Sequence, residues 1–435
     1  MNILLAYQYC DLGGIQAIMG ALGRRYKARG HACELFFFNA GPALAQYPAD
    51  WKVHVGGLAE LLNVAASRRF DVVHAITEDW PTGISAVRHL KKMRTALVLS
   101  SQGRIVSHWN SRHCDGLIGC SGWDVTEQQK TADFRVTRIY NGIDLERFSP
   151  EGRKADGGKP IVAWVGRGSD LEQKRIDLLA GAAKELVAAG LRLWIADPDG
   201  PAKVVASAAQ ALEPIAERWG KVAWDQMPGF YRDVAASGGV VLSTAAFEGL
   251  PLSLAEAQAC GSPVIGADVR GVNECVRPEK GGVLYPADIA PARLAELIVE
   301  TVRDSAAMEH RRQACAGFAA ECFGLERMVD EHLAAYEAAM ERRRAAWRVF
   351  GKGWTDSITH RSDRYSEWRM IPATRQYEAS VELADRGERR TAAAAARAAF
   401  TTCPALFRKG ERMRHLVGVH LSQKSPPSEG HAVRA

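Results

Sequence analysis

Residues 239–267 read GVVLSTAAFEGLPLSLAEAQACGSPVIGA, and this stretch indicates the fold class. The run GVVLST is short and apolar, which is typical of a buried strand. Pro251 suits the first turn of a helix, and Gly261 suits the position just after its end. SPVIGA then predicts another buried strand. A strand, a helix and a strand in this order predict a parallel sheet covered by helices.

The same alternation extends in both directions. Before residue 150 the predicted strands are NILLAY, ACELFFF, DVVHAI, TALVLS and GLIGC, and after it they are IVAWVG, LRLWIAD, GVVLST, SPVIGA and GGVLYP. The turn-rich segment SPEGRKADGGKP at 149–160 separates the two sets, as a linker would. We therefore expect an α/β protein with two doubly wound, Rossmann-like domains, at 1–150 and 151–324, facing each other across a cleft.

The remainder of the chain has a helical pattern. An apolar stripe between Leu325 and Met340 predicts a helix that packs on other elements. We expect residues 325–345 to cross back to the first domain, residues 346–421 to form a basic helical extension, and residues 422–435 to be a flexible tail.

Charge is concentrated in that extension. From residue 341 onward there are 19 Lys and Arg against 10 Asp and Glu, whereas the whole chain has a net charge of only +6. This excess predicts contact with an anionic membrane surface, or else a solvated helical face. A nucleic-acid-binding protein is the weaker alternative, because no nucleic-acid-binding module is recognisable. The absence of a leader pattern and of long apolar runs predicts a cytoplasmic protein, with a peripheral position at the inner face of the membrane left open.

Two glutamates eight positions apart carry the main functional signal. Glu248 falls on the loop after a strand, and Glu256 falls inside the following helix. Between them, the exposed backbone amides at the positive end of the helix would suit a diphosphate. The residues expected to hold this ligand through the loop and helix start are Gly249, Leu250, Pro251, Leu252 and Ser253. One carboxylate for a sugar and one for a ribose would complete a nucleotide-sugar site.

Two other interpretations of the glutamates stay open at this point. They could be the acid and nucleophile of a glycosidase, because part of the span between them is loop and their spacing alone does not exclude it. They could also be a helix-capping residue and a solvated one. The layout suits an extended polyhydroxyl ligand better than either alternative.

The segment EGLPLSLAEAQACGSPVI closely resembles the core motif of retaining GT-B glycosyltransferases of glycosyltransferase family 4. RGVNECV at 270–276, followed by GGVLYP, resembles the next element of that family. IYNGIDLERFSP at 139–150 resembles its interdomain signature. The resemblance covers roughly residues 1–345.

The resemblance implies roles for particular residues. Glu248 would hold hydroxyls of the donor sugar, and Glu256 would accept hydrogen bonds from the ribose. WVGRGSDLEQKRIDLL at 164–179 resembles the segment that supplies two cations to the diphosphate, which implies Arg167 and Lys174 here. The gap between them is about two residues longer than in the family pattern, so Arg175 is an alternative to Lys174. Such cations stabilise the charge of a departing nucleoside diphosphate.

In the first domain, the loop containing Gly13 and Gly14 resembles the family's first glycine loop, where backbone can approach a ligand closely. The family's frequent histidine–glycine pair is replaced by Gln102 and Gly103. Gln102 could bind a sugar hydroxyl but could not carry a proton. His108 is a weaker candidate for a catalytic histidine, whereas His74 is expected to be structural.

The resemblance thus predicts a retaining glycosyltransferase that uses a UDP- or GDP-sugar as substrate, with no cofactor and no metal. The acceptor would be a glycan or lipid-linked glycan of bacterial envelope polysaccharide or glycolipid synthesis. The alternative is a non-catalytic nucleotide-sugar or glycan-binding protein on the same scaffold.

Overall fold

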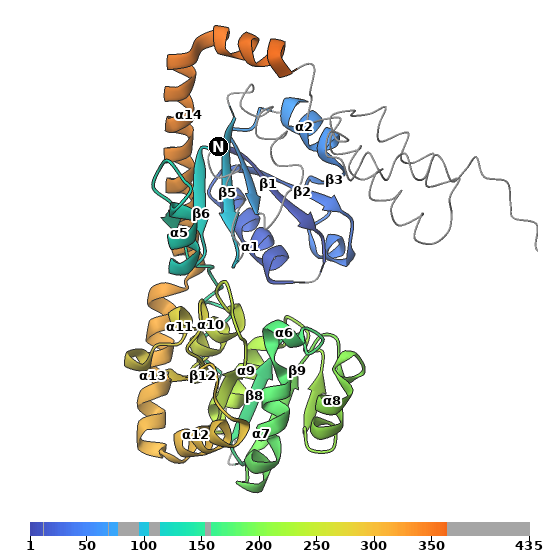
Figure 1. Cartoon of the computed structure of the whole chain (residues 1–435), viewed down its shortest axis with the longest axis vertical. Coiled ribbons are helices and arrows are strands. Elements are labelled where there is room, and N and C mark those ends of the chain that lie inside the picture. Colours follow the sequence, from blue (N-terminus) through green and yellow to red (C-terminus); the bar gives the residue numbers. More distant parts are fainter. Residues whose placement is uncertain (12, 68, 77–94, 104–113, 153–157, 363–435) are drawn as a thin grey trace, which may run out of the picture. The chain divides into compact units, whose positions relative to one another are not determined.

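The computed structural model describes residues 1–11, 13–67, 69–76, 95–103, 114–152 and 158–362 (Figure 1). One compact unit comprises Met1–Asp79 and Thr95–Arg343 and holds both sheets. The second unit, Trp80–Arg94 and Arg344–Ala435, lies mostly outside the described residues. Beyond Ser362, the expected basic extension and flexible tail therefore lie outside the described residues.

The first sheet has seven parallel strands in the order β3-β2-β1-β4-β5-β6-β7. Its strands are β1 (Asn2–Tyr9), β2 (Ala32–Asn39), β3 (Val53–Val55), β4 (Val72–Ile76), β5 (Ala96–Ser101), β6 (Gly116–Gly119) and β7 (Thr137–Arg138). The central strands β4, β5 and β6 are buried along their whole length, which explains their unbroken apolar sequences.

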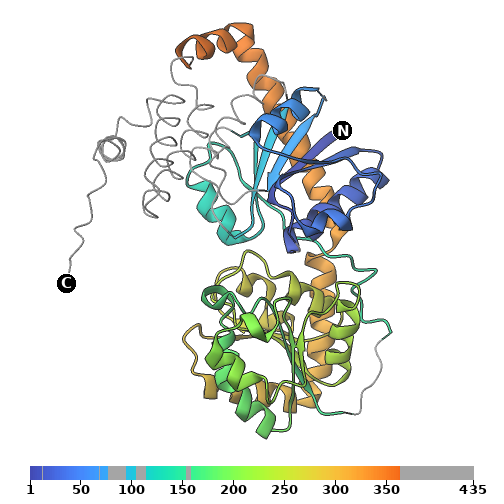
Figure 2. The same cartoon turned by 90° about the vertical axis from the view of Figure 1, so that its right-hand side faces the viewer.

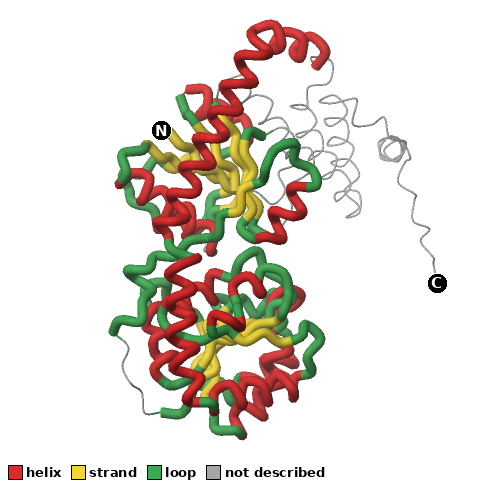
Figure 3. The backbone as a smooth tube through the Cα atoms, turned by 90° about the vertical axis from the view of Figure 1, so that its left-hand side faces the viewer, coloured by secondary structure: helices red, strands yellow, loops and turns green. Residues whose placement is uncertain are grey.

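The second sheet has six parallel strands in the order β10-β9-β8-β11-β12-β13. They are β8 (Ile161–Val165), β9 (Arg192–Ala196), β10 (Arg218–Gly220), β11 (Val240–Ser243), β12 (Val264–Ala267) and β13 (Val283–Tyr285). Figure 3 shows the strands of each sheet at the centre of a domain, with helices around them. The expected fold class, two doubly wound Rossmann-like α/β domains, is confirmed.

Helices connect and cover the strands in both domains (Figure 2). The helices of the first domain are α1 (Gly14–Ala28), α2 (Leu58–Ser67) and α5 (Gly122–Gln129). Those after the linker are α6 (Leu171–Lys174), α7 (Ile176–Ala188), α8 (Ala206–Leu212), α9 (Met227–Ala236), α10 (Leu252–Ala259), α11 (Val272–Cys275), α12 (Pro291–Arg303), α13 (Ser305–Cys322) and α14 (Leu325–Ser362). Short 3-10 turns lie at Pro42–Gln46, Pro201–Lys203 and Pro278–Lys280.

The chain passes between the two domains twice, and the two passages are hydrogen-bonded to each other. The amide of Ile143 donates to the Phe323 carbonyl at 2.8 Å, and the amide of Leu325 donates to the Ile143 carbonyl at 2.9 Å. A Cβ at Gly142 would lie 2.8 Å from the Cα of Leu325, so glycine allows this close approach.

The first half of α14 belongs to the core of the amino-terminal domain. Its apolar stripe packs in one cluster with residues of β1, β2, α1 and β4. Ion pairs also join the two helices: Arg25 of α1 and Arg29, which follows its last residue, contact Glu326 at 2.7 and 2.5 Å. The stripe read from the sequence therefore faces the first sheet.

Among the described residues, no helix is both long enough and apolar enough to cross a membrane. Within the same part of the chain, no group of three or more His, Cys, Asp or Glu side chains could hold a metal ion.

Candidate functional site

The second sheet changes winding direction between β8 and β11. These two strands are neighbours, whereas β9 and β10 extend the sheet on one side and β12 and β13 on the other. Loops that leave such neighbouring strands diverge, and the opening they create at the carboxyl end of the sheet is where ligands of this architecture bind. The loop after β8 carries Arg167, and the loop after β11 carries Glu248.

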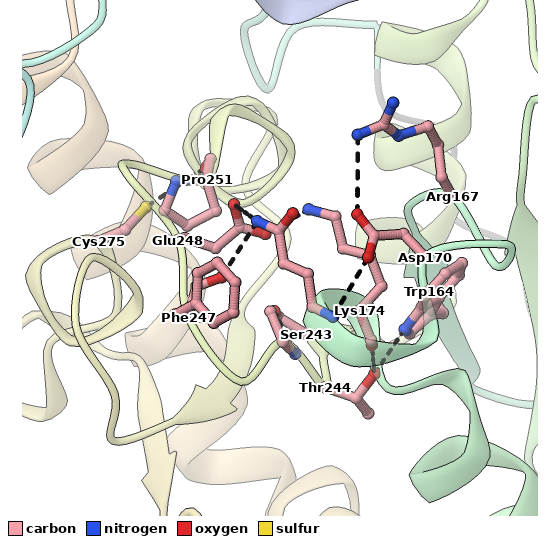
Figure 4. A network of polar contacts seen from close by, with 12 residues as sticks. Trp164, Arg167, Asp170, Lys174, Ser243, Thr244, Phe247, Glu248, Pro251 and Cys275 are labelled. Atoms are coloured by element: carbon pink, nitrogen blue, oxygen red, sulfur yellow. Dashed lines mark hydrogen bonds and ion pairs between the residues drawn. The ribbon is translucent and has the colours of Figure 1, made fainter. Parts of the chain in front are cut away.

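The turn between α6 and α7 directs Lys174 at Glu248. Asp170 caps α6 by accepting from the amide of Gln173 at 3.3 Å. Arg175 then adopts the left-handed conformation, with φ 47° and ψ 51°, which breaks the helix immediately after Lys174. The ammonium of Lys174 forms an ion pair with the Glu248 carboxylate, and their side chains are only 20% and 12% exposed (Figure 4).

Further hydrogen bonds join α6 to the Glu248 loop. Gln173 donates from Nε2 to Glu248 Oε2 at 3.1 Å and to the Phe247 carbonyl at 3.2 Å. The Thr244 hydroxyl donates to the Lys174 carbonyl at 2.6 Å and accepts from Trp164 Nε1 at 2.8 Å (Figure 4). The carboxylate and its cation are therefore fixed by the backbone as well as by their own charges.

The two other predicted cations lie elsewhere. Arg167 is 63% exposed, and its guanidinium approaches Asp170 at 3.8 Å rather than Glu248 (Figure 4). Arg175 donates to the Ala287 carbonyl at 3.4 Å and lies 3.9 Å from Asp177. The geometry thus brings Lys174, and not the alternative Arg175, to the first glutamate.

The start of α10 presents free backbone donors next to Glu248. Pro251 is the N-cap residue of this helix, and Gly261 follows its end with φ +79°. Within the described residues, no acceptor contacts the amides of Gly249, Leu250, Leu252 and Ser253. These are the donors that an anion at a helix start would use.

Glu256 lies on α10 in a different environment. Its Oε2 accepts a hydrogen bond from the Tyr231 hydroxyl at 3.1 Å. Burial raises the pKa of Glu256 to about 7, although the Tyr231 hydrogen bond and the nearby charge of Arg147 act in the opposite direction. This carboxyl therefore titrates near neutral pH.

A pocket of about 840 Å³ lies beside β9 and β10. It lies between the loop after β10 and α9, and Arg147 from the interdomain segment also lines it. Its charged lining residues are Arg147, Arg218, Lys221, Asp225, Arg232 and Asp233. Arg147 stacks on Trp224, with its guanidinium 3.5 Å from the ring centroid.

Of the two glycines of the first loop, Gly14 approaches the start of α10. A Cβ at Gly14 would lie 3.2 Å from the Leu252 side chain, and Gly13 is the extended N-cap residue of α1. Gln102 lies beyond the end of β5, where its Oε1 accepts from Asn141 Nδ2 at 2.8 Å. His108, the weaker candidate for a catalytic histidine, lies outside the described residues.

His74, expected to be structural, lies inside β4. The ring is 1% exposed, with Nδ1 at 2.7 Å from the Tyr336 hydroxyl and Nε2 at 3.0 Å from Ser100 Oγ. Both ring nitrogens thus have partners on the sheet and α14, which agrees with a structural role.

Some residues that the sequence did not reveal also contribute to the site. Gln173 directly precedes Lys174, so its proximity to Glu248 follows once α6 is known to be a single turn. Tyr231 is 25 positions from Glu256 along the chain, and only the packing of α9 against α10 brings them together. No local pattern in the sequence signals that contact.

The chain matches two family models that cover these domains in order. The model described as "Glycosyltransferase Family 4" matches residues 12–147, and the one described as "Glycosyl transferases group 1" matches residues 159–304. Together they account for well over half of the chain. The chain belongs to glycosyltransferase family 4.

Curated relatives agree with that assignment. A D-inositol 3-phosphate glycosyltransferase from Catenulispora acidiphila is 32% identical over 264 residues, which are 56% of this chain and 59% of the relative. A GDP-mannose-dependent alpha-mannosyltransferase from Mycobacterium tuberculosis is 30% identical over 220 residues, or 48% of this chain and 53% of the relative. The chain thus spans little more than half the length of these relatives.

Solved structures of glycosyltransferases share the fold over most of the chain. HepE from Anabaena, in complex with UDP and glucose, has a TM-score of 0.61 at 19% identity, and the match covers 78% of this chain and 99% of that one. A glycosyltransferase from Rickettsia africae has a TM-score of 0.66 at 13% identity, covering 78% and 98%. At these identities the likeness establishes the architecture.

Proposed function

We propose that the chain transfers a sugar from a nucleoside diphosphate sugar to a hydroxyl of an acceptor glycan. The observation that carries this proposal is the arrangement at the β8–β11 switch point. A carboxylate paired with a lysine lies beside unpaired helix-start amides, and a second carboxylate lies within the helix. Glu248 would bind sugar hydroxyls, the helix-start amides would bind a diphosphate, and Glu256 would bind a ribose.

The diphosphate would bind between Lys174 and the start of α10. The Lys174 ammonium forms an ion pair with the Glu248 carboxylate. A diphosphate would attract this ammonium and leave the Glu248 carboxylate to accept hydrogen bonds from hydroxyls of the donor sugar. Arg167, with its exposed guanidinium, is free to swing onto the same phosphates. Fixed cations of this kind stabilise the charge that builds on the leaving group.

Glu256 would bind the ribose, and the neighbouring pocket would take the base. Arg147 relates the pocket to Glu256, because it lines the pocket and its charge acts on the Glu256 carboxyl. The names of the relatives and of the HepE structure, which include GDP-mannose and UDP, support a UDP- or GDP-sugar as the donor.

Transfer would proceed with retention at the anomeric carbon. The acceptor hydroxyl oxygen forms the new bond to C1 on the face from which the diphosphate oxygen leaves, and the departing phosphate takes the hydroxyl proton. Lys174 and the α10 amides hold the resulting diphosphate, so the step needs no protein nucleophile and no metal. The acceptor would be a glycan or lipid-linked glycan, as in envelope polysaccharide or glycolipid synthesis, and the enzyme would work in the cytoplasm or at the inner membrane face.

The experiment is to measure nucleoside diphosphate release from UDP- and GDP-hexoses, with glycan and lipid-linked acceptors, and to determine the anomeric configuration of the product by NMR. Release that depends on an acceptor, with the configuration retained, supports the proposal. Binding of a nucleotide-sugar without turnover under any condition would instead indicate a non-catalytic binding protein.

A further inference from the structure

The segment Arg270–Glu274, with the sequence RGVNE, lies between β12 and the end of α11 and contacts two distant parts of the protein. One is the loop that carries Glu248, and the other is the start of α5 in the amino-terminal domain. The roles proposed above for the donor-binding residues do not involve this segment.

Its backbone supports the Glu248 loop directly. The amide of Glu248 donates to the Arg270 carbonyl at 3.1 Å. Gly271 has φ +76°, and a Cβ there would lie 2.2 Å from the Glu248 carbonyl oxygen and 2.6 Å from that of Gly249. Only glycine combines this conformation with so close an approach. The Arg270 guanidinium also lies 4.8 Å from the ring of Phe247 on the same loop.

The other end of the segment binds the amino-terminal domain. The Glu274 carboxylate accepts from the amides of Gly122 at 2.7 Å and Trp123 at 3.2 Å, and from the Tyr140 hydroxyl at 3.0 Å. Gly122 and Trp123 begin α5, where backbone amides have no partner within the helix and the helix dipole favours negative charge. Arg270 adds a cation–π contact, with its guanidinium 3.9 Å from the Trp123 ring centroid.

The amino-terminal domain also contacts the Glu248 loop directly. Gly103 follows β5 with φ +90°, and a Cβ there would lie 2.8 Å from both the amide nitrogen and the Cα of Gly249. The peptide between Glu248 and Gly249 is therefore flanked by two glycines, Gly103 of one domain and Gly271 of the other. A displacement of either domain would move this peptide.

We propose that Glu274 is a positioning residue for sugar transfer. By holding the start of α5, Glu274 fixes the segment Arg270–Glu274. That segment in turn holds the Glu248 loop in the conformation that binds the donor sugar. The inference rests on the proposed function for its effect on turnover, but the link between Glu274 and the Glu248 loop is structural and can be tested without turnover.

The experiment compares three variants of the full chain. Glu274→Ala removes the acceptor for α5, Glu274→Gln keeps one oxygen acceptor but turns a donor toward the α5 amides, and Glu279→Gln changes an exposed glutamate in the following turn as a matched control. Tyr140→Phe, which removes a single hydrogen bond to Glu274, serves as a milder variant if Glu274→Ala does not fold by circular dichroism.

Two measurements follow, each with a distinct expectation. In hydrogen exchange followed by mass spectrometry, peptides covering Gly122–Gln129 and residues 245–251 should both exchange faster in Glu274→Ala, less so in Glu274→Gln, and not in Glu279→Gln. In transfer assays, kcat of Glu274→Ala should fall by about 100-fold, as small misplacements of catalytic groups can cause, with the donor KM changed less than about threefold.

Faster exchange at the start of α5 alone, with the Glu248 loop and kcat unchanged, would show that Glu274 merely caps α5 and would overturn the inference. Equal behaviour of all variants would do the same. If the wild type transfers no sugar, the proposed function fails, whereas the exchange pattern of the two peptides still decides whether Glu274 positions the loop.

Discussion

The two sheets have the same kind of switch point but place polar side chains differently around it. In the first sheet, β4 carries His74 inside the strand, where the ring is buried and bonded to Tyr336 and Ser100. In the second, Lys174 and Glu248 lie beyond the ends of β8 and β11, partly exposed and bonded to each other. A polar group within a strand is satisfied by the fold itself, whereas one past the strand ends can exchange its partner for a ligand.

Among the variants compared, Lys174→Ala should have the largest effect, and that effect is on the rate of transfer. It removes the cation that would stabilise the departing diphosphate, and loss of one such group lowers kcat by about 100- to 1,000-fold. Lys184→Ala, an exposed lysine on α7, is the matched control and should leave kcat unchanged. Steady-state assays of diphosphate release compare the two. Equal rates for both variants would mean that Lys174 has no part in transfer.

Glu256→Gln should alter the pH dependence of stability. Because the folded state raises the pKa of Glu256 from 4.5 to about 7, this carboxyl stabilises the fold most below pH 4.5, and its contribution is lost as the pH rises through 7. The loss is at most about 3 kcal/mol, at about 1.4 kcal/mol per pKa unit. Urea unfolding at pH 5 and 8 should show this decline in the wild type only. A parallel decline in Glu256→Gln would assign the pH dependence to another group.

His74→Ala tests whether the buried polar group of the first sheet contributes to stability and not to ligand binding. The variant removes the ring partner of the Ser100 hydroxyl and one partner of the Tyr336 hydroxyl, which keeps its contact with the Tyr26 hydroxyl at 3.2 Å. Loss of a buried hydrogen-bond partner costs about 1–3 kcal/mol. Thermal unfolding should show a lower Tm, and UDP or GDP should bind as to the wild type. His310→Ala, on the exposed surface of α13, should change neither. Weaker nucleotide binding by folded His74→Ala would place His74 in the functional site.

Substitutions of Arg175 should have the smallest effect. Two of them separate the contribution of its backbone conformation to stability from the contribution of its side chain to transfer. Its left-handed conformation costs a residue with a Cβ about 1–2 kcal/mol, and glycine avoids this cost. Arg175→Gly should therefore be more stable than Arg175→Ala by about 1 kcal/mol in urea unfolding. Both variants should keep most of the transfer activity, because Lys174 rather than Arg175 contacts Glu248. A loss of transfer as large as that of Lys174→Ala would restore Arg175 as the second cation.

The sequence predicted the interior strands and the edge strand β13, but not the other three edge strands. The buried runs correspond to ten strands, whereas β3, β7 and β10 were missed. Those three are edge strands of two or three residues with no buried position, so no apolar run marks them. An apolar run in the sequence signals burial of a strand, and these three strands lack it, whereas the edge strand β13 has a buried Tyr285 and was predicted.

The candidate site was predictable to the extent that it is local in sequence. Glu248, the α10 start and Glu256 lie within nine consecutive residues, so helix geometry alone orders them. Tyr231 and Glu274 reach the site only through contacts between α9 and α10 and between the domains. The choice of Lys174 over Arg175 depends on the left-handed turn at Arg175, an unusual conformation for a residue that is not glycine.

Isothermal titration calorimetry with UDP and GDP tests the central claim most directly, namely that Lys174, the α10 start and Glu256 form a nucleotide diphosphate site. The wild type and Lys184→Ala should bind one of the two nucleotides at a single site with equal affinity. Lys174→Ala and Glu256→Ala should each bind it at least about tenfold more weakly, as expected when a charged hydrogen-bond partner is lost. Unchanged affinity in both of these variants would contradict the account.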